Sequence, residues 1–198
     1  MTKRYLFKME IIDLLSKNDL LLAVDLIRNA DNHYFNLFSN SKDEINDKLL
    51  DMHSDERTDF SQVKGIYVEK KIVGAIVFYP ASEHYLRQSF SLSYLKMGSK
   101  FSERTLKRFN DGVSDFKSNG LYLSRIAISS DYQGQGYCKK TISLLSSLAI
   151  LNSYNEVLLH VRDDNYPAIR CYTDVGFEPN VCSSLKVYKT FRKKLIQN

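Results

Sequence analysis

Two glycines separated by one residue, Gly134 and Gly136, stand immediately before a stretch with helical spacing. Glycines let a backbone approach a ligand closely and adopt conformations that other residues avoid. The first four N–H groups of a helix lack acceptors within it, and the helix dipole favours negative charge at that end. These residues therefore predict an anion site that suits a pyrophosphate, to which Lys139 and Lys140 in the first turn would add charge pairing.

The glycine loop by itself leaves other functions open. A Walker loop needs a longer spacing and a Lys-Ser/Thr pair after its second glycine, and the sequence has neither. A dinucleotide fingerprint needs a third glycine and an early position in a Rossmann unit. Taken alone, the two glycines are equally compatible with a tight strand-to-helix turn that binds nothing.

A second group of residues with functional spacing lies downstream, within residues 160–177. Pro167 suits the first turn of a helix, and Gly176 suits the left-handed position just after its end. Asn165 and Tyr172 are seven positions apart, so they project from nearly the same side of that helix. Each also has a purely structural interpretation, Asn165 as a helix cap and Tyr172 as a core aromatic.

Residues 125–138 resemble motif A of the GNAT superfamily of N-acetyltransferases, in which an apolar strand leads into a Gln/Arg-x-x-Gly-x-Gly/Ala pattern. Residues 165–177 resemble the second signature of the family, Asn-x-x-Ala-x-x-x-Tyr-x-x-x-Gly-Phe, with every anchor at its spacing. Cys138 replaces the usual Gly or Ala, and Ser130 stands where many members have proline. The resemblance implies an α/β fold of the mixed, α+β type: a GNAT-like, mostly antiparallel sheet, splayed between its fourth and fifth strands, with helices on both faces.

The resemblance also implies transfer of an acetyl group from acetyl-CoA to a primary amine by direct attack in a ternary complex. The backbone at Ile126, Ala127 and Ile128 would hold the pantetheine arm and polarise the thioester carbonyl, where negative charge develops. Asn165 would contact the cofactor arm, and Tyr172 would protonate the departing thiolate. The pyrophosphate would lie on Gln133, Gly134, Gln135, Gly136, Tyr137, Cys138 and Lys139.

The base that accepts the proton of the amine is not decided by the sequence. A free amine with a pKa of about 10 is almost wholly cationic at neutral pH, so a proton must leave. His160 occupies the strand position where some family members have glutamate, and its ordinary pKa suits proton removal near neutrality. A histidine facing the other side of the sheet fits this position equally well. Glu69, Glu83 and His84 are further candidates, and a water chain without a dedicated base stays open.

The spacing of apolar residues predicts the elements that position these groups. The second and third strands are expected to form a hairpin that Pro80 ends. Residues 81–119 show no strand pattern, are compatible with a helix over 101–117, and form a long connection of the kind that often carries function. Predicted strands cover residues 5–15, 63–69, 72–79, 121–129, 156–161 and 185–191, and predicted helices cover residues 18–29, 42–53, 137–152 and 168–175.

Length, composition and charge are those of a folded protein. At 198 residues, with 43% hydrophobic and 26% charged residues, the chain can bury a substantial core. It contains no repeat and no linker, so residues 1–198 are expected to form one domain. A formal charge of +5 favours anionic partners. Because the positive residues are scattered without interleaved aromatics, no nucleic-acid partner is expected.

Cys138, Cys171 and Cys182 are odd in number and lack the spacing of metal ligands, so no metal is expected. They indicate free thiols in a reducing compartment. The apolar stretch near the N-terminus is interrupted by Glu10 and Asp13, so neither a signal peptide nor a membrane span is predicted. The cytoplasm is therefore the expected location, with no membrane partner.

Two functions from different classes fit these observations. One is an N-acetyltransferase, and the other is a non-catalytic acyl-CoA-binding or regulatory module with the same fold. Tyr172 favours the enzyme, because a module that only binds has less need of an acid at that position. Residues 41–53 and 81–119 would shape the acceptor site, but a small-molecule amine, a peptide N-terminus and a protein lysine all stay open, as does a homodimer.

Overall fold

The computed structural model describes residues 8–98, 116, 118–179 and 188–196. Its centre is a seven-stranded sheet in the order β1-β2-β3-β4-β5-β7-β6. β4 and β5 are parallel and every other neighbouring pair is antiparallel, which confirms the expected mixed, mostly antiparallel sheet. The strands are β1 (Met9–Ile12), β2 (Val63–Val68), β3 (Lys71–Pro80), β4 (Gly120–Ile128), β5 (Glu156–Arg162), β6 (Glu178–Pro179) and β7 (Tyr188–Lys194).

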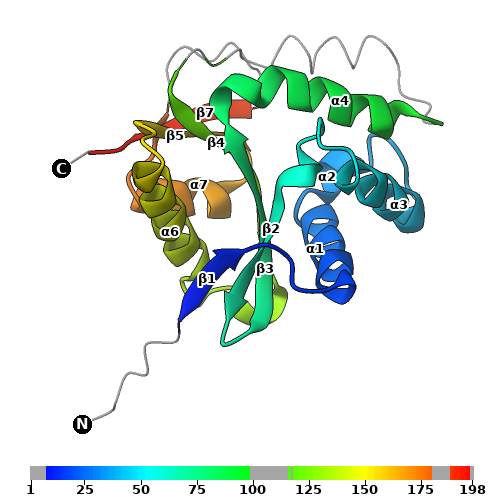
Figure 1. Cartoon of the computed structure of the whole chain (residues 1–198), viewed down its shortest axis with the longest axis horizontal. Helices are drawn as coiled ribbons and strands as arrows, with labels where there is room; N and C mark the ends of the chain where they lie inside the picture. Colours follow the sequence, from blue (N-terminus) through cyan, green and yellow to red (C-terminus); the bar gives the residue numbers. More distant parts are fainter. Residues whose placement is uncertain (1–7, 99–115, 117, 180–187, 197–198) are drawn as a thin grey trace.

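Helices cover both faces of the sheet, as expected (Figure 1). One face carries α6 (Tyr137–Leu151) and α7 (Tyr166–Asp174). The other carries α1 (Lys17–Ala30), α2 (Asn32–Phe35), α3 (Lys42–His53) and α4 (His84–Lys96). Short 3-10 turns, η1 (Phe60–Gln62), η2 (Ala81–Glu83) and η3 (Ser130–Tyr132), join strands to helices. None of the helices in the described ranges is both long and apolar enough to cross a membrane.

Local sequence explains where several of these elements begin and end. The hydroxyl of Ser16 accepts a hydrogen bond from the backbone N–H of Asp19, and that of Ser41 accepts one from Glu44, so each serine starts a helix. Glu69 and Lys70 take positive φ angles of 49° and 65°, which suits the tight turn of the β2–β3 hairpin. The predicted hairpin is therefore confirmed, with its turn one residue earlier than expected.

The prediction differs from the structure mainly at the ends of the chain. The first strand was expected over residues 5–15, but β1 pairs with β2 over only four residues before the helix cap at Ser16 intervenes. The last strand was expected over residues 185–191, whereas β7 continues to Lys194 because it stays paired with β5 as far as Glu156. The charged residues at the C-terminal end of β7 interrupt the apolar alternation from which a strand is predicted. β6 was not predicted, and the predicted helix over 101–117 lies outside the described residues except for Phe116.

The fourth and fifth strands separate after a short parallel ladder, which confirms the expected splay. β4 pairs with β5 only from Gly120 to Leu123, although both strands continue beyond that point. At the same place β4 has a bulge, because Arg125 and Leu123 face consecutive residues of β3 and Ser124 has no partner there. A bulge bends a strand and re-aims its side chains, so the gap between β4 and β5 opens where the ladder is interrupted.

Candidate active site

A pocket of about 100 Å³ lies in the gap between β4 and β5. Its walls come from both strands, from α1 on one face of the sheet and from α7 on the other. The pocket therefore reaches from one layer of helices to the other through the sheet. The residues that line it are Ile27, Ala30, Asp31, Ser124, Arg125, Ile126, His160, Val161, Arg162, Asn165, Tyr172 and Tyr188.

The backbone of β4 presents hydrogen-bonding groups to this gap. The N–H of Ser129 donates to the carbonyl of Val73 on β3 at 2.9 Å, which fixes the direction of its own amide. Amide directions alternate along an antiparallel strand, so the N–H groups of Ile126 and Ile128 point away from β3, towards β5. That of Ala127 points to β3. Two of the three strand residues predicted to hold a thioester arm therefore present N–H groups to the gap.

The glycine loop has the open backbone that an anion requires. Gly134 and Gly136 take positive φ angles of 73° and 80°, and a Cβ on either would meet no atom within 4 Å. Gly136 caps α6 without any side-chain hydrogen bond, so the first amides of the helix stay available. The side-chain amides of Gln133 and Gln135 donate to the carbonyls of Ile128 and Asp131 and brace the loop. The geometry fits a pyrophosphate.

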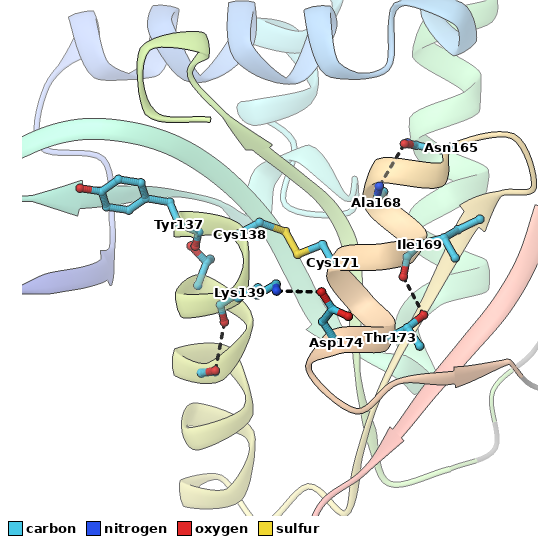
Figure 2. The surroundings of a disulfide bond; sticks show 11 residues. Tyr137, Cys138, Lys139, Asn165, Ala168, Ile169, Cys171, Thr173 and Asp174 are labelled. Atoms are coloured by element: carbon cyan, nitrogen blue, oxygen red, sulfur yellow. Dashed lines mark hydrogen bonds and ion pairs between the residues drawn. A yellow bond between two sulfur atoms is a disulfide. The ribbon is translucent and has the colours of Figure 1, made fainter. Parts of the chain in front are cut away.

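Two links tie the start of α6 to α7 (Figure 2). Cys138 and Cys171 form a disulfide with their Cα atoms 6.7 Å apart, so the prediction of free thiols is wrong for this pair. Tertiary packing brings together two cysteines that are 33 positions apart in the sequence. The ammonium of Lys139, predicted to meet the pyrophosphate, lies 2.7 Å from the carboxylate of Asp174. Cys182 lies outside the described residues.

Asn165 and Tyr172 of α7 both line the pocket, as their spacing predicts. The side-chain oxygen of Asn165 also accepts a hydrogen bond from the N–H of Ala168 at 3.3 Å, so this residue caps the helix as well. Tyr172 is only 8% exposed and packs against Phe177. Burial raises the pKa of the Tyr172 phenol well above its ordinary value, so the hydroxyl keeps its proton at neutral pH.

His160 belongs to an aromatic cluster that borders the pocket. Its Nδ1 lies 2.9 Å from the hydroxyl of Tyr122, and its ring packs in tilted contact with those of His84 and Phe116. The buried Nε2 has no hydrogen-bond partner among the described residues. Burial lowers the pKa of His160 to about 4, so the ring is neutral at pH 7 and a weak proton acceptor.

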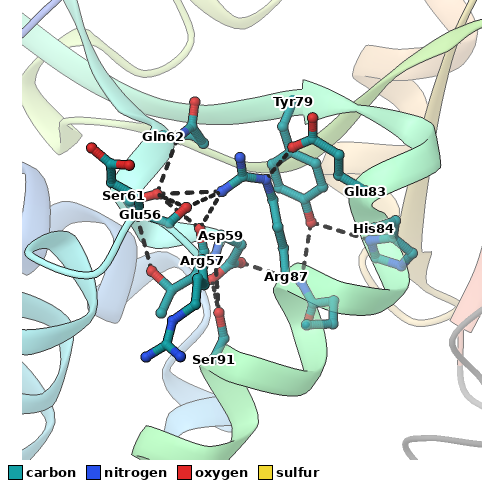
Figure 3. Close-up of polar contacts among 12 residues, drawn as sticks. Glu56, Arg57, Asp59, Ser61, Gln62, Tyr79, Glu83, His84, Arg87 and Ser91 are labelled. Carbon is teal, nitrogen blue, oxygen red and sulfur yellow. Dashed lines mark hydrogen bonds and ion pairs between the residues drawn. The ribbon is translucent and has the colours of Figure 1, made fainter.

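The other base candidates lie away from the pocket lining. Glu69 is in the hairpin turn between β2 and β3, at the tip of the hairpin. Glu83 pairs with Arg87 at 2.6 Å (Figure 3). His84 is buried, with its Nδ1 3.1 Å from the hydroxyl of Tyr79 (Figure 3), and burial lowers its pKa well below the ordinary value. None of these three residues lines the pocket, although the ring of His84 lies 5.6 Å from that of His160.

A buried carboxylate, Asp59, supports the wall of the pocket from behind. It is fully buried, and it forms an ion pair with the guanidinium of Arg125. The hydroxyls of Ser91 and Ser124 donate to its two oxygens at 2.6 and 3.0 Å. Figure 3 shows Asp59 beside Ser91 of α4. The sequence offered no motif that marks Asp59, because its partners come from two separate segments, α4 and β4.

Asp31 is a second residue at the pocket that the sequence did not indicate. It caps the C-terminus of α1, where its N–H donates to the carbonyl of Ile27, and it lines the pocket from the α1 face. Burial raises the pKa of its carboxyl to about 6, although Arg125 and Arg162 nearby oppose that shift. A single aspartate after a helix has no distinguishing sequence pattern, so only the fold brings it to the gap.

Comparison with known proteins identifies the kind of protein that has this site. The sequence model of the Acetyltransferase (GNAT) family matches residues 25–177. The chain belongs to this family. It is therefore an acetyltransferase whose co-substrate is acetyl-CoA. A comparison with curated protein sequences gives no match.

Solved structures share the GNAT fold at low sequence identity. An N-acetyltransferase from Staphylococcus aureus Mu50 is 17% identical, with 92% of this chain and 100% of that chain covered and a TM-score of 0.60. The PaiA N-acetyltransferase from Thermoplasma acidophilum, in complex with coenzyme A, is 16% identical over 94% and 99% of the two chains, with a TM-score of 0.54. The ribosomal-protein-S18-alanine N-acetyltransferase from Escherichia coli is 15% identical over 95% and 94%, with a TM-score of 0.52.

In this GNAT acetyltransferase the two sequence motifs lie on opposite sides of the disulfide, and both face the same gap. The predicted residues Ile126, Asn165, Tyr172 and His160 all line the pocket. Residues from Gln133 to Lys139 lie outside its lining, in the loop and first turn of α6. Within the described residues, no group of His, Cys, Asp or Glu side chains is placed to hold a metal ion.

Proposed function

We propose that the chain transfers the acetyl group of acetyl-CoA to a primary amine, which attacks directly while both substrates are bound. The observation that carries this proposal is the pocket between β4 and β5. It combines strand N–H groups, which can stabilise negative charge on a carbonyl oxygen, with a buried phenol. When bound, acetyl-CoA supplies the activated thioester.

The start of α6 would hold the pyrophosphate of acetyl-CoA. The open backbone of Gly134 and Gly136 and the free amides of the first helical turn support this role. Lys139 would add a positive charge, which its pairing with Asp174 holds at the α6–α7 junction. Asn165, at the start of α7, lines the pocket and would contact the cofactor arm.

Tyr172 would protonate the thiolate that leaves. Its hydroxyl keeps its proton at neutral pH because burial raises the pKa of the phenol. A thiolate leaves more readily when a donor stands next to the sulfur, and such general acid catalysis is worth about 10²–10⁴ in rate. His160 stays a prediction for the base, and its lowered pKa of about 4 makes it a weak one.

Replacement of Tyr172 by phenylalanine tests the acid role. The Tyr172→Phe variant should lower kcat by about 100-fold or more, since only the hydroxyl is removed. Thiol release from acetyl-CoA would be measured with three amines: n-butylamine, a peptide with a free N-terminus, and an N-blocked peptide that contains lysine. Tyr166→Phe is the matched control, because Tyr166 lies on the same helix and is 74% exposed.

Calorimetry with acetyl-CoA separates binding from chemistry. Tyr172→Phe should bind acetyl-CoA about as tightly as the wild type, because its ring remains in place. Unchanged turnover in Tyr172→Phe would remove the acid role. Acetyl-CoA binding without turnover of any amine by the wild type would instead indicate a module that binds the cofactor without catalysis.

A further inference from the structure

The pocket joins two chemically different side chains across the sheet. Tyr172 reaches it from α7, within the core between the sheet and α6. Asp31 reaches it from the end of α1, beside Ile27 of the opposite core. A group bound in the gap between β4 and β5 would therefore have a phenol on one side and a carboxylate on the other.

Asp31 is an acidic residue in the pocket lining, and it has no ionic partner among the described residues. Within the described ranges its carboxylate forms no hydrogen bond and no ion pair. Its exposure is intermediate, so the pocket gives a ligand access to it. Several other carboxylates are already paired, namely Asp25 with Arg28, Asp55 with Arg57, Asp59 with Arg125, Asp164 with Arg162 and Asp174 with Lys139.

We propose that Asp31 binds the ammonium group of the acceptor and takes the first proton that this group loses during acetyl transfer. This inference rests on the proposed acetyltransferase function and specifies its acceptor as a primary aliphatic amine that arrives as a cation. The pocket volume of about 100 Å³ admits a slender aminoalkyl end, while the rest of the acceptor stays outside.

The charges around Asp31 are consistent with a bound cation. Arg125 on β4 and Arg162 on β5 face it, but each already has a carboxylate partner of its own. His33 of α2 is the third group that, with Arg125 and Arg162, lowers the pKa of Asp31 by its charge. An ammonium would therefore be the first cation to contact Asp31 directly. The phenols of Tyr34, Tyr172 and Tyr188 also interact electrostatically with it.

The arrangement separates the proton transfers at Asp31 and at Tyr172. The ammonium has three N–H protons, of which the amide keeps one. The carboxylate of Asp31 takes the first proton and so frees the amine, and solvent takes the second as the nitrogen forms a bond to the thioester carbonyl carbon. The carbon–sulfur bond breaks, and the sulfur leaves with its electron pair and takes the proton of Tyr172. The products are an amide, a free thiol and one proton released to solvent, and exchange with solvent deprotonates Asp31 and reprotonates Tyr172 between turnovers.

Asp31 is also better suited to accept a proton than His160. Burial raises the pKa of Asp31 to about 6, and it lowers that of His160 to about 4. At pH 7 both groups are mainly in the unprotonated form, but the carboxylate holds a proton more strongly. A negative group also attracts the ammonium before reaction, which a neutral imidazole does not.

The Asp31→Asn variant tests the inference, because asparagine keeps the shape and removes the charge. We expect kcat/KM for n-butylamine to fall by about 100-fold or more, a typical contribution of a general base. The dissociation constant of acetyl-CoA, measured by calorimetry, should stay within about twofold, since Asp31 lies on the opposite face from α6 and α7. Asp25→Asn is the matched control, an exposed aspartate of α1 outside the pocket, and should keep wild-type kcat/KM.

The pH dependence distinguishes proton transfer from a structural role. The ratio of kcat/KM between wild type and Asp31→Asn cancels the titration of the amine itself. It should fall as the pH drops through about 6, the pKa of Asp31. A ratio that does not change with pH, or equal kcat/KM in the two proteins, would overturn the assignment, as would a pH response that disappears only in His160→Gln.

Failure of this inference can be told apart from failure of the proposed function. If the wild type does not bind acetyl-CoA, the proposed function fails. If the wild type binds acetyl-CoA and the Asp31→Asn variant acetylates n-butylamine as well as the wild type does, only the role of Asp31 fails. A wild type that binds acetyl-CoA but neither binds nor acetylates any of the three amines also overturns the cation site.

Discussion

Loss of the Cys138–Cys171 disulfide should destabilise the protein by an amount that depends on the length of the loop between the two cysteines. The two cysteines are 33 positions apart. In the chain-entropy description, cross-linking a loop of that length restricts the unfolded state by about 4 kcal/mol at 25 °C. For a chain of 198 residues, a loss of about 4 kcal/mol lowers Tm by about 8–16 °C.

Thermal unfolding followed by circular dichroism, with and without dithiothreitol, measures this change. The wild type should show the lower Tm only in the presence of dithiothreitol. The Cys138→Ala/Cys171→Ala variant should unfold near the Tm of the reduced wild type and should not respond to the reductant. The Cys182→Ala variant keeps both bonded cysteines, so it should respond as the wild type does.

Thiol counting checks the bond directly. Of the three cysteines in the sequence, the disulfide uses two, so native protein should alkylate at one cysteine before reduction and at three after it. Three alkylated cysteines in the unreduced protein, or a Tm that dithiothreitol leaves unchanged, would refute the reasoning. The same result would restore the original expectation of free thiols.

Two further predictions concern the wall of the pocket and the glycine loop. Asp59→Asn should lower the free energy of unfolding by about 3–5 kcal/mol in urea, because it leaves the guanidinium of Arg125 buried without its partner. The Asp59→Asn/Arg125→Met double variant should recover much of this loss, and a double variant no more stable than the single one would contradict the argument. Gly136→Ala should cost about 1–2 kcal/mol of stability through its positive φ and should also weaken acetyl-CoA binding. Gly98→Ala, at a positive φ with equally open surroundings, should show a similar stability loss and unchanged acetyl-CoA binding in calorimetry.

The sequence predicted those parts of the fold that local patterns determine. Strands and helices follow from the spacing of apolar residues, and Ser16 and Ser41 mark where two helices start. The two motifs on β4, α6 and α7 come to the same gap because each is a continuous segment with its own turn chemistry. Asn165 and Tyr172 were found together for the same reason: helical periodicity places them on one side of α7.

Residues that depend on tertiary contacts could not be predicted in this way. Asp31 and Asp59 are single carboxylates in otherwise ordinary segments, and only the packed sheet brings them to β4. Cys138 and Cys171 were interpreted as free because nothing in their spacing shows that their helices lie side by side. The weak basicity of His160 likewise comes from the burial of its ring beside Tyr122, which a strand pattern does not reveal.

The bulge at Ser124 connects these features. Before it, Leu121 and Leu123 face the core under α6, and after it Ile126 faces that same core, so the alternation of β4 changes by one residue. Ser124 and Arg125 consequently fall on the same face of the sheet, where both bond to the carboxylate of Asp59.

This irregularity also determines what the gap contains. If Ser124 were paired with β3 as an ordinary strand residue, the amides of Ile126 and Ile128 would point to β3, and that of Ala127 would point to the gap. The side chain of Arg125 would turn towards α6 and lose Asp59. One unpaired residue in β4 thus directs two N–H groups into the gap and keeps a cation beside Asp31. Deletion of Ser124 would join Leu123 to Arg125 in regular alternation and leave these directions unchanged, so thiol release should persist in a variant that circular dichroism shows to be folded.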